Sequence, residues 1–277
     1  MPVLYFFSNL LYLLIYCVFG YRKKVVRKNL SLVFPKKTVR ERLEIEQKFY
    51  KHLSDMIFGG LKTISISKKK IKKRYKFKNI EVINTLLQNN KSIVLLASHY
   101  GNWEWAICLP FYAISSVNIS YTSITNKYFN NLIKKTREKF NTKCIKSEGF
   151  IKNMILEHRN NKHGIYVLLI SDQSPHIGKI HFWSDFLGID IPVNNGGELM
   201  AKKFDFAVVN MLTNKKKRGY YETEFKLTSK VEDSSKDIKI TELYLQELEN
   251  QIRKQPEFYL WSHNRFKHMY ETVKTYS

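Results

Sequence analysis

A histidine and a glutamate five positions apart, His99 and Glu104, have the side chains best suited to chemistry in this chain. A carboxylate that approaches one imidazole nitrogen can keep that nitrogen protonated and leave the other as a general base. Gly101 lies between the two residues and would relax a turn that folds the carboxylate back onto the ring. Chance alone produces such a spacing in a chain of this composition. On these residues alone, a structural His–Glu pair and a catalytic dyad both stay open.

The elements around this pair favour a site. The run IVLLA at 93–97 is typical of a buried strand, and His99 follows its end. Similar runs at 165–170 (IYVLLI) and 206–212 (FAVVNML), separated by helical patterns, predict an α/β fold with a mixed, largely parallel sheet flanked by helices. Ligands of such sheets bind just past the strand ends, where Asp172-Gln173 also lies.

The sequence also predicts where two other elements lie. Thr38 is a suitable N-cap for a helix over 39–63, because apolar residues recur there near helical spacing. The stretch 220–228, YYETEFKLT, alternates polar and apolar residues and predicts a strand at an edge of the sheet.

Further residues are candidates for the site. Trp103 and Trp105 are expected to line an apolar pocket for a long chain. Asp172-Gln173 either supports the site from a strand end or contacts the substrate. Residues 194–197, NNGG, open an expected helix whose free backbone amides suit an anion, although a tight turn explains the glycines equally well. Three histidine pairs spaced five apart are interpreted as coincidental or surface residues, and not as metal ligands: His158 and His163, His176 and His181, His263 and His268.

Composition bounds the class of protein. With 277 residues, 44% of them hydrophobic, the chain can bury a core. Lys and Arg number 47 against 24 Asp and Glu, and the resulting net charge of +23 needs an anionic partner: nucleic acid, a membrane surface, or an acidic protein or substrate. Cys17, Cys108 and Cys144 form no CxxC pair, so neither a disulfide framework nor a zinc site is indicated. A reducing, cytoplasm-facing location fits.

The N-terminal segment favours a membrane partner. Residues 3–19, VLYFFSNLLYLLIYCVF, carry no charge, and basic residues follow them at once. A secretory signal has the reverse order, so the segment is expected to be retained. Ser8 and Asn9 inside the run favour a helix in the membrane interface over a spanning one, and a buried core helix is the alternative. The chain is therefore divided into a membrane-associating helix with a basic flank, 1–30, and a single α/β domain, 31–277.

Two basic runs have open interpretations. Residues 68–78, KKKIKKRYKFK, hold eight basic residues in eleven with apolar residues interleaved. They fit either a solvated surface or contact with an anionic membrane. The KKKR run at 215–218 lies between two predicted strands and fits a solvated hairpin turn or an exposed anion contact.

Around the histidine, the chain resembles a known family. Ser98–Glu104, SHYGNWE, is similar to the HxxxxE/D block of the lysophospholipid acyltransferase superfamily, in the form found in bacterial lipid A biosynthesis acyltransferases. The similarity covers nearly the whole chain. The other matching segments are Arg27–Leu30 with Phe34-Pro35 (RxNL…FP), Tyr121 with Asn126, Leu132 and Arg137, Asp172-Gln173 (DQ), Phe186–Gly188 (FFG), and Pro256 with Trp261, His263, Arg265 and Phe266. The chain departs from the family pattern at Thr122, where arginine is common, and at Lys127, where proline is usual.

This resemblance implies a glycerol-phosphate/lysophospholipid acyltransferase-like fold and an enzyme. Such an enzyme moves an acyl chain from acyl carrier protein, or less often coenzyme A, to a hydroxyl of a membrane lipid, here most plainly a lipid A precursor. His99 would be the general base and Glu104 the residue that orients it, with no metal or other cofactor. Candidates for substrate or oxyanion contacts are Arg137, Asn102, Asp172 and Gln173. Arg137 on a helix surface is the alternative for that residue.

The implied partners are acyl carrier protein, an anionic lipid acceptor and the cytoplasmic face of the inner membrane. Acyl carrier protein is acidic, so the basic surface suits its docking. The same chemistry on an aminolipid or lysophospholipid is an alternative. A non-enzymatic nucleic-acid-binding protein is a second alternative, although no nucleic-acid motif is recognisable.

Overall fold

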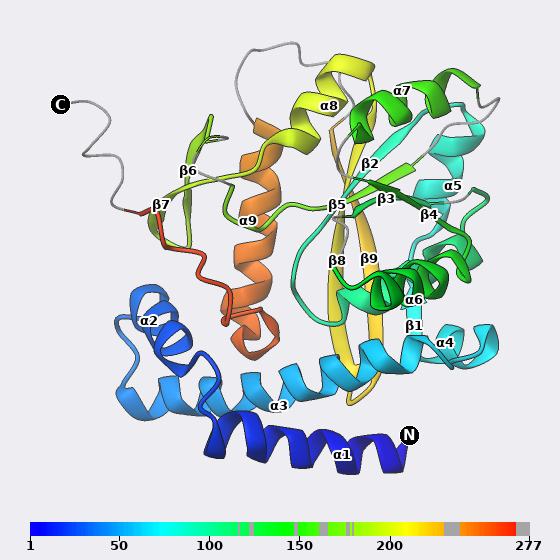
Figure 1. The fold of residues 1–277 in the computed structure, drawn as a ribbon. Helices are drawn as coiled ribbons and strands as arrows, with labels where there is room; N and C mark the ends of the chain where they lie inside the picture. Colours follow the sequence, from blue (N-terminus) through cyan, green and yellow to red (C-terminus); the bar gives the residue numbers. More distant parts are fainter. Residues whose placement is uncertain are drawn as a thin grey trace.

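A seven-stranded sheet forms the centre of the computed structural model, which describes residues 1–115, 117–121, 125–146, 149–160, 166–175, 178, 180–229 and 239–269. The strand order is β1-β9-β8-β2-β5-β3-β4 (Figure 1). These strands are β1 (Tyr75–Phe77), β2 (Ile93–Ala97), β3 (Val117–Tyr121), β4 (Thr142–Lys146), β5 (Tyr166–Ile170), β8 (Ala207–Lys217) and β9 (Tyr220–Ser229). All neighbours pair in parallel except β8 and β9. The predicted α/β fold with a mixed, largely parallel sheet is confirmed.

Helices cover both faces of this sheet and cross one end of it (Figure 1). They are α1 (Pro2–Tyr12), the π-helical η1 (Leu13–Val18), α2 (Lys23–Val33), α3 (Val39–Thr63), α4 (Lys68–Arg74), α5 (Glu81–Gln88), the 3₁₀ helix η2 (Trp103–Phe111), α6 (Lys127–Glu138), α7 (Phe150–Asn160), α8 (Gly196–Phe204), α9 (Lys239–Lys254) and the 3₁₀ turn η4 (Pro256–Phe258). A separate antiparallel pair, β6 (Trp183–Phe186) and β7 (Ile189–Pro192), packs beside α9.

The central strand β2 packs against apolar side chains on both faces of the sheet. All five of its residues are buried, and they alternate between two apolar clusters. Val94 and Leu96 join the cluster built with α7, α8 and α9, whereas Ile93, Leu95 and Ala97 join the one built with α5 and η2. A strand that is apolar at every position is typical of a parallel sheet covered by helices.

The register of β2 and β5 brings two strand ends together. Ala97 pairs with Ile170, and the Ser171 amide donates to the Ala97 carbonyl at 3.1 Å. The two residues that follow Ala97 therefore run alongside the two that follow Ile170. This juxtaposition positions the site.

A long helix, α3, supports the site from one end of the sheet. Its start matches the sequence prediction, because the Thr38 hydroxyl accepts from the Glu41 amide and the Glu41 carboxylate accepts from the Thr38 amide in a capping box. The N-terminal α1 packs along α3 (Figure 1), where the Ser8 hydroxyl donates to Asp55 at 2.7 Å. The serine that interrupts the apolar run thus faces the protein.

The opposite side of α1 and η1 is apolar and exposed. Val3, Phe6 and Val18 are 69%, 66% and 67% exposed, so this segment is not a buried core helix. Within the described ranges, no single helix is long and apolar enough to cross a bilayer. Only Pro2–Val18 and Lys23–Val33 taken together have the length and composition required, and they are bent by 85°.

One sequence expectation is wrong. The strand β9 is not at an edge, because the three residues of β1 pair with its Tyr221–Thr223 and place β9 inside the sheet.

The run 68–78 has its interleaved Ile71, Tyr75 and Phe77 buried in the core, and its basic side chains face outwards. Contact of those basic side chains with an anionic membrane stays a prediction.

The KKKR run forms the β8–β9 turn, and its role is more than that of a solvated hairpin. Arg218 makes a bidentate ion pair with Asp55, with contacts of 3.0 and 2.6 Å. Lys215 is only 12% exposed and lies 3.9 Å from the same carboxylate. The turn therefore ties the sheet to the α1–α3 pair.

Candidate active site

The His99 imidazole is held by a carboxylate from the neighbouring strand. Its Nδ1 lies 2.7 Å from Asp172 Oδ1, and the backbone amide of His99 donates to Asp172 Oδ2 at 3.0 Å. Asp172 is 2% exposed and follows β5, as His99 follows β2. Since an ionised carboxylate only accepts, Nδ1 carries the proton and Nε2 keeps a free lone pair.

The pKa of His99 reflects this pairing. Burial acts to lower the pKa, but the charge and hydrogen bond of Asp172, with a weaker contribution from the Glu104 charge, raise it above its usual value of 6.5. For Asp172, burial acts to raise the pKa, and the His99 interaction, aided by Arg265, holds it below its usual value. The two groups stabilise each other's charged forms.

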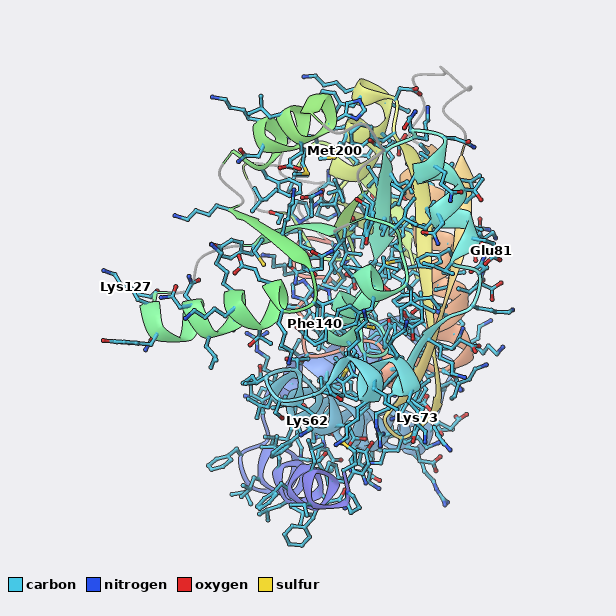
Figure 2. The ribbon with its side chains drawn as sticks, turned by 90° about the vertical axis from the view of Figure 1, so that its right-hand side faces the viewer. Lys62, Lys73, Glu81, Lys127, Phe140 and Met200 are labelled. Atoms are coloured by element: carbon cyan, nitrogen blue, oxygen red, sulfur yellow. The ribbon has the colours of Figure 1, made fainter. Side chains whose placement is uncertain are left out.

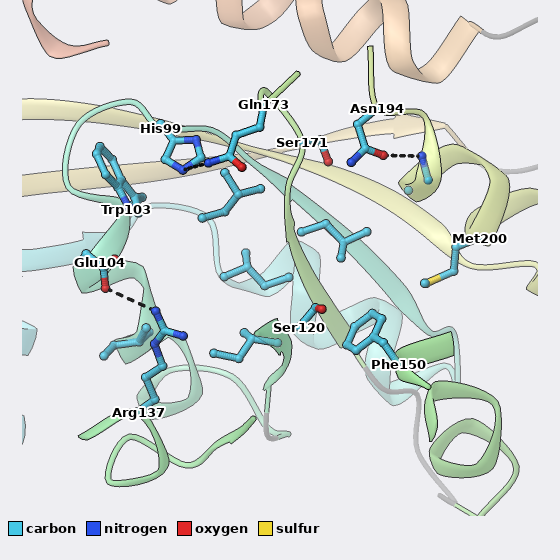
Figure 3. Close-up of a pocket in the computed structure, with 17 residues that line it drawn as sticks. His99, Trp103, Glu104, Ser120, Arg137, Phe150, Ser171, Gln173, Asn194 and Met200 are labelled. Carbon is cyan, nitrogen blue, oxygen red and sulfur yellow. Dashed lines mark hydrogen bonds and ion pairs between the residues drawn. The ribbon is translucent and has the colours of Figure 1, made fainter. Parts of the chain in front are cut away.

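Gln173 contacts the other nitrogen of the His99 ring. Its side-chain nitrogen lies 3.1 Å from His99 Nε2 (Figure 3). Because Nε2 accepts, the carboxamide is the donor. It occupies the place that a hydroxyl would need in order to give up a proton to this nitrogen.

Glu104 lies on the same cavity wall but does not hold the imidazole. Its carboxylate faces Arg137 of α6 at 3.9 Å, and Glu104 is 38% exposed (Figure 3). Within the part of the chain that is described, no hydrogen bond joins it to His99. The expected orienting contact from Glu104 is therefore corrected to Asp172, because the pairing of β2 with β5 places Asp172 beside the ring. Glu104 still acts on His99 through its charge.

The turn after β2 is fixed from three directions. Gly101 has φ +65°, and a Cβ there would come within 2.9 Å of Thr213, so both its conformation and its surroundings require glycine. His52 of α3 lies 3.1 Å from the Gly101 carbonyl. The C-terminal segment adds backbone bonds, from the Gly101 amide to the Phe258 carbonyl and from the Leu260 amide to the His99 carbonyl.

His52 has a defined tautomer. It is buried, and burial together with the nearby Lys215 lowers its pKa to about 3. Its Nε2 therefore donates to Gly101, and its Nδ1 accepts from Lys215 Nζ at 3.4 Å.

A cavity of about 590 Å³, which we call the main cavity, opens in front of His99. Its polar end holds His99, Glu104, Arg137 and Gln173. Its far end holds Phe150 and Met200 (Figure 3). Apolar side chains from β3, β5 and η2 line the wall between them: Ile107, Ile119, Leu168, Leu169 and Ile170. A chemical group at one end and an apolar wall beyond it suit a long-chain substrate.

Two predicted site residues lie elsewhere. Asn102 is 2% exposed and caps η2, where its Oδ1 accepts from the Trp105 amide at 3.2 Å. The Trp105 indole donates to the Gly59 carbonyl at 2.9 Å and packs in the core. Neither lines the main cavity, because both are needed to build the turn and η2. Trp103, by contrast, does line it.

The NNGG segment contributes to the main cavity wall. Asn194, Gly196 and Gly197 line it, and the Asn194 Oδ1 accepts from the Gly196 amide at 3.0 Å. A Cβ on Gly197 would meet Leu96 at 2.7 Å, so α8 requires glycine to pack against β2. The expected helix is confirmed as α8, whereas an anion at its start stays a prediction.

Residues far apart in the sequence support the Asp172 side. Arg265 is buried and donates to the Pro192 carbonyl at 3.0 Å and to Ser174 Oγ at 3.2 Å, which fixes the segment after Asp172. Asn29 of α2 donates to the carbonyls of Trp261 and His263, each at 2.8 Å. The N-terminal and C-terminal motifs therefore meet beside the site.

Some sequence expectations lie outside the described residues: Thr122, Ile165, His163 and His176. Among the residues that are described, no cluster of His, Cys, Asp or Glu is arranged to hold a metal ion.

A buried His–Asp pair at the carboxyl ends of two parallel strands, facing a cavity lined by polar and apolar side chains, defines an α/β protein equipped for general-base chemistry. Comparison with known proteins identifies the group. The family described as bacterial lipid A biosynthesis acyltransferase matches residues 2–268, and the chain belongs to that family.

A curated relative agrees with this assignment. The chain is 25% identical over 241 residues to a lipid A biosynthesis acyltransferase of Haemophilus influenzae, a match that covers 84% of this chain and 72% of the relative. The protein is thus an acyltransferase that acts in lipid A synthesis. The family expected from the sequence is confirmed.

Proposed function

We propose that the protein transfers an acyl chain from the thioester of acyl carrier protein to a hydroxyl of a lipid A precursor, with His99 as the general base. The observation that carries this proposal is the His99–Asp172 pair at the polar end of the main cavity. The pair leaves Nε2 as a proton acceptor facing the space where the substrates would meet.

The acceptor hydroxyl displaces the Gln173 carboxamide and hydrogen bonds to His99 Nε2. As its oxygen attacks the thioester carbonyl, the proton passes to Nε2 and the imidazolium is stabilised by Asp172. The tetrahedral intermediate collapses, the carbon–sulfur bond breaks, and the thiolate leaves and takes the proton from His99. The products are the new ester and the free carrier thiol, and the enzyme returns to its starting state.

Arg137 is the candidate to stabilise the oxyanion of that intermediate. It lines the main cavity, is 26% exposed, and is held towards the cavity by Glu104 at 3.9 Å. A guanidinium placed before the reaction begins needs little reorganisation as the charge develops. In this proposal Glu104 is a positioning residue for Arg137, which replaces the predicted orientation of His99 by Glu104.

The donor acyl chain would extend along the main cavity from its carbonyl at His99. Phe150 and Met200 at the far end are apolar and suit a methyl terminus. A carrier that delivers this chain is acidic, and the net charge of +23 suits its docking.

The proposed location is the cytoplasmic face of the inner membrane. The exposed apolar side of α1 and η1 supports this location, with the basic residues of α2, such as Lys24 and Lys28, beside it. Apolar side chains inserted between headgroups, together with cations near an anionic leaflet, are sufficient for peripheral attachment.

The test is transfer of a radiolabelled acyl chain from acyl carrier protein to a lipid A precursor in mixed micelles. The His99→Ala variant is expected to lose nearly all turnover while keeping its circular dichroism spectrum and melting temperature. His181→Ala, at an exposed histidine, is the matched control and is expected to behave as wild type. Near-normal transfer by a folded His99→Ala protein would remove the mechanism.

A further inference from the structure

A second apolar cavity, of about 350 Å³, lies between α3, η2 and α6, and we call it the α3–α6 groove. Its walls carry Leu53, Ile57, Leu61, Ile107, Leu132 and Ile133. The groove shares Trp103, Glu104, Ile107 and Arg137 with the main cavity. The two cavities therefore meet at one wall, and anything that occupies the groove ends beside Arg137.

The outer rim of the groove is apolar and exposed. Ile57 and Leu61 of α3 and Ile64 just after it are 43%, 52% and 45% exposed. Phe58, next to Ile57, stacks on Phe7 of α1 with ring centroids 6.4 Å apart, so an apolar contact with α1 adjoins the rim.

The helix on the other side of the groove is basic. Between Lys127 and Glu138, α6 carries four Lys and Arg residues and one acidic residue. It projects from the body of the protein with Lys127 at its outer end (Figure 2). At its inner end, Lys139 donates to the carbonyls of Thr63, Ile64 and Ile66 at 2.8–3.1 Å and fixes α6 to the end of α3. The α6 side chains that line the groove are mainly apolar, and Arg137 is the basic one among them. The net positive charge of the helix as a whole is complementary to a phosphorylated headgroup.

From these observations we propose that the α3–α6 groove holds a hydrocarbon tail of the anionic lipid acceptor. This inference rests on the proposed function, in which two long-chain substrates must meet at His99. The donor chain arrives from water on a carrier and fills the main cavity, whereas the acceptor arrives from the membrane and has its tails on the side of the apolar rim. A tail in the groove leaves the headgroup beside Arg137, so that a hydroxyl can reach His99.

Gly60 provides the test. It lines the groove from α3, and a Cβ added there meets no atom within 4 Å. Gly60→Phe therefore fills the groove without a backbone clash and replaces a residue that disfavours helix. Ile133→Trp reduces the same space from the α6 wall. Leu199→Phe, at an exposed apolar position on α8, is the matched control.

The measurement is steady-state transfer from acyl carrier protein to lipid A precursors with full-length and with shortened tails. Gly60→Phe and Ile133→Trp are expected to raise the KM for the full-length acceptor about tenfold, which corresponds to losing the burial of about two methylene groups. The KM for the donor should stay unchanged, and the penalty should shrink for the short-tailed acceptor. A protein that is merely destabilised would not distinguish the two acceptors.

A second experiment places the tail directly. An acceptor with a photoreactive diazirine at a tail terminus is expected to label the peptides of α3 and α6 in wild type and not in Gly60→Phe. Labelling at Phe150 or Met200 would overturn the inference, as would a variant that alters the donor KM or the donor chain-length preference, or one that alters no parameter. If wild type transfers no acyl chain to any acceptor, the proposed function fails instead.

Discussion

Two carboxylates act on one imidazole in this molecule, and their different surroundings give them different roles. Asp172 is 2% exposed and touches His99 at 2.7 Å, whereas Glu104 is 38% exposed and contacts Arg137. Asp172 therefore fixes the tautomer and the orientation of the ring, and Glu104 contributes only a more distant charge. Distance and burial decide which acid orients a base, and spacing along the chain does not.

The largest loss of turnover is expected from removing the Asp172 charge. Asp172→Asn keeps the shape but can present a donor to Nδ1, which would place the proton on Nε2 and remove the base. We expect kcat to fall by about 10²- to 10⁴-fold. Acyl transfer under single-turnover conditions measures the change. If Asp172→Asn lowers kcat no more than Glu104→Gln does, Asp172 is not the residue that orients His99.

The pH dependence separates the two carboxylates by how far each one raises the pKa of His99. His99 acts as a base only when neutral, so kcat should rise with pH as the ring deprotonates, at a pKa above 6.5. Asp172 raises that pKa, and Asp172→Asn should therefore move the acidic limb to lower pH. Glu104→Gln should move it in the same direction and less. Rate profiles between about pH 5 and pH 9, the range in which histidine titrates, measure both shifts. Equal shifts would contradict the comparison.

A smaller effect is expected from Glu104→Gln on turnover. The Glu104–Arg137 pair is partly exposed, and pairs of this kind contribute at most about 1 kcal/mol, which corresponds to a loss of about fivefold. Arg137→Lys should lower kcat more than Glu104→Gln, because the planar guanidinium is the group proposed to contact the oxyanion. The kcat values of both variants, measured at saturating donor and acceptor, check this order.

The smallest effect is expected at Gln173. Its carboxamide donates to the His99 nitrogen that the acceptor hydroxyl needs. Gln173→Ala removes one competing hydrogen bond, so kcat should change by about twofold, which corresponds to about 0.5 kcal/mol. Because that bond favours the neutral ring, its loss should move the acidic limb slightly to higher pH, opposite to the shift from Asp172→Asn. A shift in the same direction as that of Asp172→Asn would show that Gln173 does not act on Nε2.

The sequence was informative where local chemistry decides the structure. Unbroken apolar runs predicted β2 and β5, Thr38 predicted the start of α3, and the polar residues after both strands were recognised as a site. The cavity does collect His99, Glu104, Arg137 and Gln173.

Long-range pairing could not be predicted in the same way. The contact between His99 and Asp172 depends on β2 lying next to β5 with Ala97 opposite Ile170, and alternation along each strand contains no information about its neighbour. The same limit explains β9, whose three-residue neighbour β1 is too short to recognise within a basic run. Asn102 and Trp105 point inwards because Asn102 caps η2 and the Trp105 indole donates to the distant Gly59 carbonyl, a contact that the sequence does not reveal.

The bonds from 258–260 to the His99–Gly101 turn have a consequence for the timing of biosynthesis. A chain emerging from the ribosome would already contain both strand ends and the residues that face the cavity before the backbone that clamps the turn is translated. Unfinished polypeptides would thus remain inert, and premature termination upstream of Pro256 should release products that are catalytically silent even when most of the sheet has folded.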